Sequence, residues 1–225
     1  MMRQQKGKKI LIYLFFFLLV GSINNTVLTK IKFEKIKNIK ISGLNEKENK
    51  NLLENILNLN LKNIFLLDGN EISKIISANS LVQNYEIFKN YPHTIDIKIE
   101  KTDFLAKINN NSKIFLLGSN GKLSDIKFSD KELPFIFGKP EINEFIELVN
   151  VIEQSRFSFN QVKNLYFFPS KRWDLELKNN VILKLSKDHT KLSLDQAFEI
   201  LNDNNFNNIK VVDARIKNQI ILNDW

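Results

Sequence analysis

The chain has 225 residues, enough for one or two folded domains, and its 43% hydrophobic and 26% charged residues argue against general disorder. It has no cysteine and two histidines, which excludes a disulfide framework, a thiolate zinc site, a histidine-rich metal site and a cysteine nucleophile. The formal net charge of +8 raises the question of a nucleic-acid partner.

The distribution of the charge argues against nucleic acid. Only 4 of the 33 basic residues are arginine, the side chain best suited to bidentate contacts with phosphate and guanine. Residues 1–32 hold six basic residues and no acidic one, whereas the rest of the chain holds 27 basic and 25 acidic residues. The net charge is therefore a property of the N-terminal segment, and we expect no nucleic-acid partner.

The N-terminal segment has the pattern of a membrane anchor. A basic tail, residues 1–9, leads directly into eleven consecutive apolar residues, 10–20. After Lys9 the next charged residue is Lys30. A helix over 10–28 would be roughly 28 Å long, close to the ~30 Å of bilayer hydrocarbon. The pattern predicts a cytoplasmic tail, a transmembrane helix over 10–28 and a linker over 29–35, with the rest of the chain outside the cytoplasm. The orienting charges would be Arg3, Lys6, Lys8 and Lys9, and the anchor residues Ile10, Leu14, Phe16, Leu18 and Val20.

A cleaved signal peptide is the alternative interpretation of this segment. Such peptides carry an apolar run of ~7–15 residues, and Val20 and Ser22 could flank a cleavage before Ile23. However, no Ala-x-Ala-like site is present, and the uncharged stretch continues past this point. We therefore expect an uncleaved anchor.

Strand and helix patterns then follow in the order β-α-α-β-β over residues 36–103. Residues 35–43 place isoleucines among lysines and end in a turn glycine. Asn45 with Glu48 is a capping pattern ahead of a helix over 46–59, and Asp68 with Glu71 repeats it ahead of a shorter helix. Strands over 82–89 and 94–101 complete this first domain.

The second half of the chain, residues 104–225, mixes hairpins with two helices. A strand over 113–117 with the turn Asn120-Gly121 predicts one hairpin, and Pro140 is expected as the first residue of a helix that reaches 152. Ser193 with Gln196 is expected to cap the second helix. The predicted fold class is α+β, with a mixed β-domain and packed helices over 104–225. Its other predicted strands cover 173–177, 181–185, 209–216 and 219–222.

Taken in order, several short stretches resemble the FtsQ/DivIB family of bacterial division proteins. Residues 39–43, IKISG, are similar to the family's I-x-V-x-G strand ending, and residues 63–68 to its N-I-F-x-x-D step. Residues 91–100 resemble its W-P-x-T-L-x-I-x-I-x-E strand. Two departures are Lys101, where the family has arginine, and Gly118, where its L-I-D-x-x-G element has an acid. Further stretches in the family's order are 133–138, 172–175 and 212–215.

The resemblance implies a POTRA domain over 36–103, an FtsQ-type β-domain over 104–225, and a non-catalytic scaffold at the division septum. Members of the family bind the small coiled-coil division proteins FtsB and FtsL and recruit them, so these are the implied partners. Other divisome proteins would contact the POTRA domain, and the lipid bilayer would hold the single helix. The resemblance implies no cofactor and no small-molecule substrate.

The principal partner contact that the resemblance implies is strand addition at the last β-strand. An apolar strand with a free edge is normally a liability unless a partner covers it. Alternatively, Ile220 and Leu222 are ordinary core residues with Ile221 facing solvent, Arg172 is an exposed surface charge, and Trp225 lies exposed at the terminus. The expected partner-binding residues are Arg172, Ile216, Gln219, Ile220, Ile221, Leu222 and Trp225.

No catalytic pattern emerges, so we expect no enzyme. His93 lies in a turn before a strand and His189 before a helix, while Asp213 and Arg215 share a strand face where an ion pair is the simpler interpretation. The sequence has no phosphate loop, no G-x-S-x-G elbow and no metal-ligand cluster.

Two other functions remain open from the sequence. A POTRA-containing, chaperone-like component of protein secretion or outer-membrane assembly should carry a long barrel of ~10-residue alternating strands, and only about 120 residues follow the first domain. A secreted soluble enzyme would need a cleaved N-terminal segment and an active site, and the sequence supplies no such site.

Overall fold

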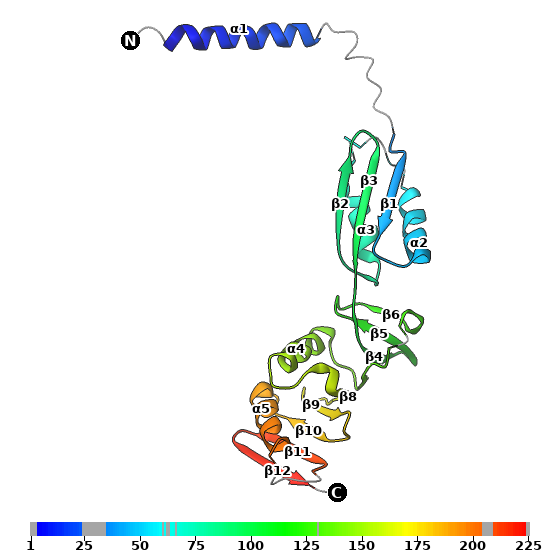
Figure 1. Ribbon diagram of the computed structural model, residues 1–225, viewed down its shortest axis with the longest axis vertical. Coiled ribbons are helices and arrows are strands. Elements are labelled where there is room, and N and C mark those ends of the chain that lie inside the picture. The colour runs from blue at the N-terminus through cyan, green and yellow to red at the C-terminus, as the bar shows by residue number, and fades with distance from the viewer. Residues whose placement is uncertain are drawn as a thin grey trace.

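The computed structural model describes residues 4–23, 35–59, 61, 64–65, 67–129, 131–203 and 209–223. In these residues, a three-stranded sheet and a nine-stranded sheet follow one another along the long axis of the molecule (Figure 1). The combination of sheets and packed helices confirms the predicted α+β class.

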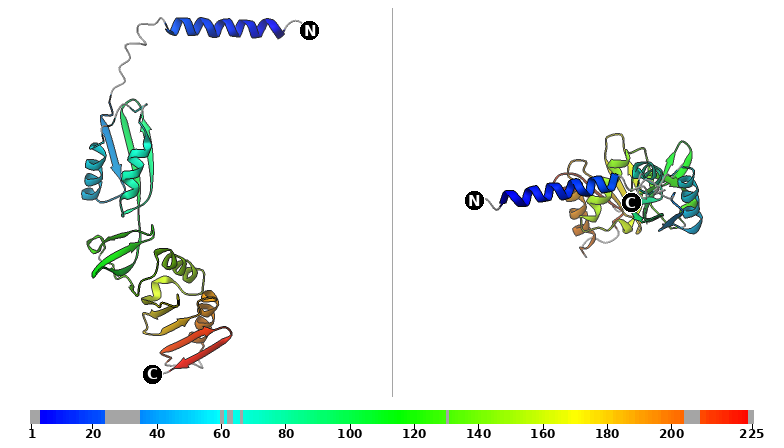
Figure 2. Two further views of the ribbon diagram at one scale, coloured as in Figure 1. Left: turned by 180° about the vertical axis from the view of Figure 1, so that it is seen from behind. Right: turned by 90° about the horizontal axis from the view of Figure 1, so that it is seen from above.

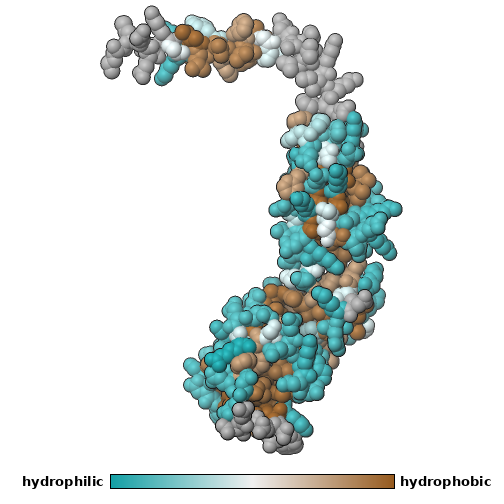
Figure 3. Space-filling model, in the orientation of Figure 1, coloured by the Kyte–Doolittle hydropathy of each residue, from teal (hydrophilic) through white to brown (hydrophobic). Residues whose placement is uncertain are grey.

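Helix α1, Gln4–Ile23, differs from the predicted span. It begins six residues before Ile10 and so includes three lysines, whereas residues 24–28 lie outside the described part of the chain. Its apolar part, residues 10–23, is about 21 Å long at ~1.5 Å per residue, less than the ~30 Å of bilayer hydrocarbon. Among the helices that the structure describes, none combines the length and the apolar character needed to cross a membrane. The apolar side chains of residues 10–20 are all exposed (Figure 3).

The first domain has the predicted β-α-α-β-β order. Helices α2 and α3 cover one face of a sheet in which β1 runs parallel and β2 antiparallel to the central β3 (Figure 1). Both predicted caps form, since Asn45 Oδ1 accepts from Glu48 N at 2.8 Å and Asp68 Oδ1 accepts from Asn70 N at 3.0 Å. The elements are β1 (Asn38–Ser42), α2 (Glu46–Leu57), α3 (Gly69–Ala78), β2 (Val82–Asn90) and β3 (Thr94–Lys101).

The second domain is one sheet in the order β12-β11-β10-β9-β8-β7-β4-β5-β6, with two helices on one face. Its predicted hairpin at Asn120-Gly121 is present between β5 and β6. The elements are β4 (Phe104–Asn110), β5 (Lys113–Gly118), β6 (Leu123–Asp125), η2 (Ile126–Phe128), β7 (Phe135–Phe137), α4 (Ile142–Glu153), η3 (Phe159–Gln161), β8 (Val162–Phe167), β9 (Trp173–Leu177), β10 (Ile182–Leu185), α5 (Thr190–Leu201), β11 (Val211–Ile216) and β12 (Gln219–Asn223).

The core of the second domain lies between the sheet and the helices α4 and α5. Phe145 and Ile152 of α4 and Leu194 of α5 are fully buried against inward side chains such as Leu165 and Leu183. The opposite face of the sheet carries no helix in the described residues, and both views of Figure 2 show α4 and α5 lying together. That open face is polar along several strands, so the sheet has a buried side and a side available to other molecules.

Two predicted helix starts in this domain are wrong. Helix α4 begins at Ile142, because Glu141 and Glu144 form a capping box and leave Pro140 ahead of the helix. Helix α5 begins at Thr190, so Ser193 lies inside it rather than capping it. The Ser193 hydroxyl is buried, donates to the Ala214 carbonyl at 2.8 Å and accepts from Ser186 N at 3.2 Å. The shortest of its hydrogen bonds reaches Ala214 of β11, 21 residues away, a contact that a local capping rule cannot predict.

Candidate functional site

The last described strand, β12, lies at one edge of the nine-stranded sheet. In the described residues it pairs with a single neighbour, the antiparallel β11. The two strands form a hairpin around Lys217 and Asn218, and Asn218 has the positive φ of 60° that suits such a tight turn. Figure 1 shows this hairpin at the end of the molecule far from the first domain. The outer edge of β12 therefore presents its backbone groups without a strand to pair with.

The side chains of β12 alternate between core and solvent. Ile220 and Leu222 are partly buried and pack against the core of the domain. Ile221, on the other face, is 47% exposed and lies opposite Asp213 of β11. Ile216 is also exposed, at the turn end of β11. The interpretation of Ile220 and Leu222 as core residues and the presence of a free backbone edge are thus both correct.

Arg172 is held in place just before β9. Its guanidinium donates from Nε to Asp174 Oδ1 at 3.0 Å and from Nη2 to Asp174 Oδ2 at 3.4 Å, and it lies 4.3 Å from the centre of the Phe168 ring. Burial raises the pKa of Asp174, although the hydrogen bonds from Arg172 act in the opposite direction. Arg172 is therefore an ion-paired, half-buried side chain and not a freely exposed charge.

The structure does not bring Arg172 and β12 into direct contact. Strands β10 and β11 lie between β9 and β12, which separates β9 from β12 by about 14 Å at ~4.8 Å per strand. Sequence reasoning grouped these residues through the family resemblance, because order along the chain carries no information about strand order in the sheet.

Charged residues on the open face fill the space between Arg172 and the free edge. Lys184 of β10 is paired in register with Asp174 on one side and with Asp213 on the other. Arg215 donates from Nε and Nη2 to the carboxylate of Asp213, at distances between 2.6 and 3.0 Å. Burial opposes ionisation of Asp213, but these hydrogen bonds outweigh it and lower the pKa. The ion pair expected between Asp213 and Arg215 is confirmed.

Sequence reasoning missed Asp174 and Lys184 as members of this charged row. The available signal was the alternation of polar and apolar residues along β9 and β10, which assigns both side chains to the open face. Lys184 lies beside Asp174 because β9 pairs with β10, and beside Asp213 because β10 pairs with β11, a strand that follows it only after helix α5. We name Arg172, Asp174, Lys184, Asp213 and Arg215 the charged row.

The remaining predicted residues fall in three places. Ile216 and residues 219–222 lie together on the β11–β12 hairpin, whereas Trp225 lies outside the described residues. The anchor residues are exposed on α1, where Lys8 and Lys9 also lie, and Lys6 is part of the same helix. Arg3 lies outside the described residues.

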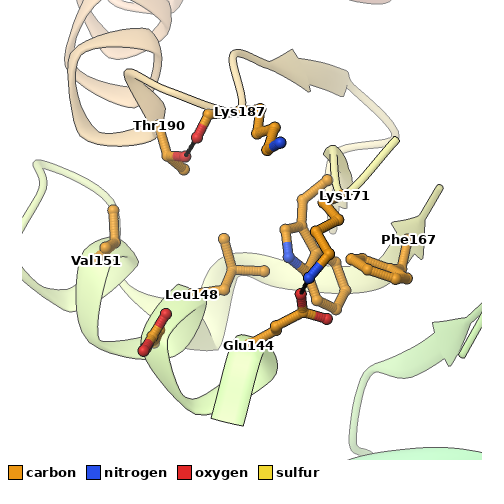
Figure 4. A pocket seen from close by; sticks show the side chains of 9 residues that line it. Glu144, Leu148, Val151, Phe167, Lys171, Lys187 and Thr190 are labelled. Atoms are coloured by element: carbon orange, nitrogen blue, oxygen red, sulfur yellow. Dashed lines mark hydrogen bonds and ion pairs between the residues drawn. The ribbon is translucent and has the colours of Figure 1, made fainter. Parts of the chain in front are cut away.

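A hollow of about 220 Å³ lies on the helical side of the domain, between α4, the turn before β9 and the start of α5 (Figure 4). Lys171 Nζ and Glu144 Oε1 are 2.8 Å apart across it, and the hydrogen bond from Lys171 lowers the pKa of Glu144. Glu144 therefore stays ionised near neutral pH, which suits an ion pair and not a general acid.

The solved structures to which the chain is similar include an extracytoplasmic domain of a cell division protein. The major extracytoplasmic domain of the trans isomer of the cell division protein DivIB from Geobacillus stearothermophilus aligns with a TM-score of 0.33 and 14% identity, covering 48% of this chain and 98% of that one.

Curated relatives match over most of the chain. The cell division protein FtsQ of Rickettsia typhi is 26% identical over 204 residues, which cover 88% of this chain and 76% of that protein. FtsQ of Rickettsia conorii is 27% identical over 206 residues, covering 88% and 74%. The cell division protein DivIB of Clostridium acetobutylicum is 30% identical over 102 residues, covering 45% and 41%.

Two family models match consecutive parts of the chain. The FtsQ-type POTRA domain matches residues 34–101, and the C-terminal domain of cell division protein FtsQ/DivIB matches residues 106–215. The first match covers the β-α-α-β-β domain, and the second covers the nine-stranded sheet up to Arg215 of β11. The chain belongs to the FtsQ/DivIB family of cell division proteins.

Proposed function

We propose that the protein is a non-catalytic scaffold of the divisome that captures FtsB- and FtsL-like proteins by adding a strand of the partner to β12. One observation carries the proposal: β12 has a free outer edge in the described structure and Ile221 exposed beside it. In such a contact, backbone hydrogen bonds supply affinity, and side chains on alternate positions supply specificity.

The lack of protection on β12 distinguishes it from the other sheet edges. Natural proteins shield edge strands with charges, proline or short length. Edge strand β6 has only three residues and includes Asp125, while β1 carries Lys40 and β2 carries Glu86 and Lys89. The five residues of β12, QIILN, contain neither a charge nor a proline. An edge of this composition favours a strand from a partner.

The charged row supports a second contact beside the added strand. Arg172 is fixed by Asp174 and by the Phe168 ring, so its remaining donors are oriented before a partner arrives. Lys184 of β10 and Arg215 of β11 are the next basic residues from Arg172 toward the free edge of β12. Each of them lies beside Asp213. A partner helix that follows the added strand could place its acidic side chains along this row, and we include Arg172 in the proposed contact for that reason.

Proline substitution tests the strand addition. Successive residues of an edge strand direct their N–H groups alternately to the neighbouring strand and to the free side. Of the variants Ile220→Pro and Ile221→Pro, one should therefore keep the pairing with β11 and lose a free-side N–H. That variant should weaken binding of a synthetic FtsB C-terminal peptide about tenfold or more, with an unchanged circular dichroism spectrum.

The matched control is Ile221→Ala, which shortens an exposed side chain and leaves every backbone group of β12 in place. Ile221→Ala should bind the peptide far better than the proline variant that keeps its pairing with β11. Unchanged peptide affinity in both proline variants would show that the partner does not add to this edge.

The proposal also includes a membrane location, with the N-terminus in the cytoplasm and both domains outside it. Its support is α1, whose apolar side chains over residues 10–20 are all exposed and follow directly on lysines (Figure 3). Lysines at a helix end can extend along the helix and keep their charges in the interface. In this arrangement the POTRA domain, next along the chain, would contact other divisome proteins near the membrane.

A further inference from the structure

We propose that one end of the POTRA domain inserts side chains into the lipid interface of the membrane. This end, which we name the POTRA tip, consists of Leu57, Phe65 and Tyr91. The inference rests on the proposed membrane location, and it adds a second, direct lipid contact made by the folded domain itself.

Three separate segments supply the residues of the POTRA tip, and direct contacts join two of them, the connection before α3 and the end of the β2–β3 hairpin. Leu57 ends helix α2, Phe65 follows in the connection to α3, and Tyr91 lies in the turn between β2 and β3. The rings of Phe65 and Tyr91 are 4.9 Å apart, and Lys89 Nζ donates to the Leu67 carbonyl at 3.2 Å. These contacts hold the connection and the turn together as one surface.

The POTRA tip is unusually apolar for an exposed surface. Leu57 is 58% exposed, Phe65 55% and Tyr91 60%, although the domain has a complete core of its own between its helices and sheet. Tyrosine, whose ring carries a polar hydroxyl, is one of the side chains enriched at membrane–water interfaces, which applies to Tyr91. Lys89, beside the tip, supplies a positive charge that suits anionic headgroups.

The path of the chain places this end of the domain nearest to α1. The chain enters the first sheet at the POTRA tip, where Lys37 N and Asn38 N both donate to the carbonyl of His93 in the β2–β3 turn. Thirteen residues lie between Ile23 and Lys37, so the fourteen steps between them can span at most about 49 Å at ~3.5 Å per residue. The opposite end of the sheet lies the length of β3 farther away, about 26 Å at ~3.3 Å per residue.

Two acidic side chains near this end are used within the domain. Asp68 Oδ1 accepts from the backbone of Asn70 and caps α3, and Asp96 Oδ2 accepts a hydrogen bond from the side chain of Asn90. Apolar and aromatic exposure, a neighbouring lysine and entry of the chain from α1 at this end of the sheet together favour lipid over a protein partner here.

Fluorescence of the full chain in liposomes tests the proposal. Tyr91→Trp introduces a tryptophan at the tip, and Ile114→Trp introduces a matched control at the exposed β4–β5 hairpin of the other domain. Each variant is reconstituted in vesicles of phosphatidylcholine and phosphatidylglycerol, with and without lipids brominated near the headgroup. Brominated lipids should quench most of the tryptophan emission added at position 91. They should not change the emission added at position 114 or the emission of the parent protein.

Flotation of the same samples separates the two proposals. If the protein floats with the vesicles and the emission from position 91 is not quenched, the tip does not touch lipid, and the membrane location still stands. A tip that has no affinity for lipid and serves instead to bind a protein would give this result, which would overturn the inference. If the protein does not float, both the membrane location and the lipid contact of the tip are wrong.

Discussion

The side-chain amide of Asn120, in the second domain, donates a hydrogen bond of 2.9 Å to the backbone carbonyl of Ser80 in the first domain. It donates a second bond of 2.9 Å to the carbonyl of Val82, and its own Oδ1 accepts from Lys122 N at 3.0 Å. Only residues 102 and 103 connect β3 to β4, so this amide joins the two domains beside the point where the chain passes between them.

The contact is part of a larger polar cluster at the junction. Gln83 of β2 accepts from the hydroxyl of Ser119 at 2.9 Å and from that of Thr102 at 3.2 Å. Ser124 of β6 donates to Ser80 at 2.8 Å. Because these bonds cross from one domain to the other, they oppose rotation about the short connection and help to set the distance between the POTRA tip and the free edge of β12.

We predict that Asn120→Asp weakens the junction. Aspartate has the same size and can still accept from Lys122 N, but it cannot donate to the two carbonyls and places a negative charge beside them. We expect a loss of about 1–3 kcal/mol in the free energy of unfolding, measured with urea, and a broader distribution of shapes in small-angle X-ray scattering. Asn110→Asp, at an exposed end of β4, is the control and should change neither.

We also predict that a side chain at position 118 destabilises the same junction. A Cβ at this position would lie 2.7 Å from Asn120 Oδ1 and 2.8 Å from Thr102 Oγ1, and Thr102 is itself buried. We therefore expect Gly118→Ala to cost about 1–3 kcal/mol in urea unfolding. Gly69→Ala, where an added Cβ meets nothing within 4 Å at the start of α3, is the matched control and should be as stable as the parent or slightly more stable. Equal stability of the two variants would refute the proposed packing.

The same glycine explains a departure from the family pattern. The family's L-I-D-x-x-G element has an acid where this chain has Gly118, and the space is filled here by Thr102 and Asn120. An aspartate side chain would not fit without displacing one of them, although the hairpin itself is present.

Acid should reduce the contribution of the Asp213–Arg215 pair. The pKa of Asp213 is lower in the folded chain than its ordinary value, so the pair stabilises the protein above the ordinary aspartate pKa of ~3.9. This contribution is lost as the pH falls through the lowered value. Arg215→Gln should therefore be less stable than the parent at pH 7, by at most ~1 kcal/mol because Arg215 is partly exposed and screened.

The measurement is thermal unfolding of both proteins between pH 7 and pH 2. The difference in melting temperature should shrink toward zero at the acid end. Arg156→Gln, which breaks a well-exposed pair with Glu199, should lie close to the parent across the whole range. A constant difference for Arg215→Gln at every pH would exclude titration of Asp213 as its cause.

The absence of cysteine makes the proposed topology directly measurable. A single cysteine at Gln4 or at the exposed Ser170 can be labelled without background from other thiols. In spheroplasts, a membrane-impermeant maleimide should label Ser170→Cys at once and Gln4→Cys only after the membrane is permeabilised. Labelling of Gln4→Cys in intact spheroplasts would place the N-terminus outside and contradict the proposed orientation.

The first domain was largely predictable because its signals are local. Asn45 and Asp68 cap their helices through backbone groups two or three residues away, and the alternation of residues 94–101 directly marks the strand β3. The second domain was less predictable. A register shift between Val162 and Asn164 interrupts the period-two pattern of β8, and β7 has only three residues. Neither strand was predicted.

The candidate site on β12 was likewise predictable only in its local features. The apolar, uncharged sequence of residues 219–222 was enough to predict an apolar last strand, because alternation and composition are properties of consecutive residues. Its position at an edge, with Arg172 three strands away and Lys184 between two acids, was decided by the pairing of β10 with β11 across an intervening helix. Such pairings depend on how apolar faces pack over long sequence separations. The sequence alone therefore determined the elements of the first domain, the apolar last strand and which family the chain resembles. Only the tertiary structure decided which edge is free and which charges lie beside it.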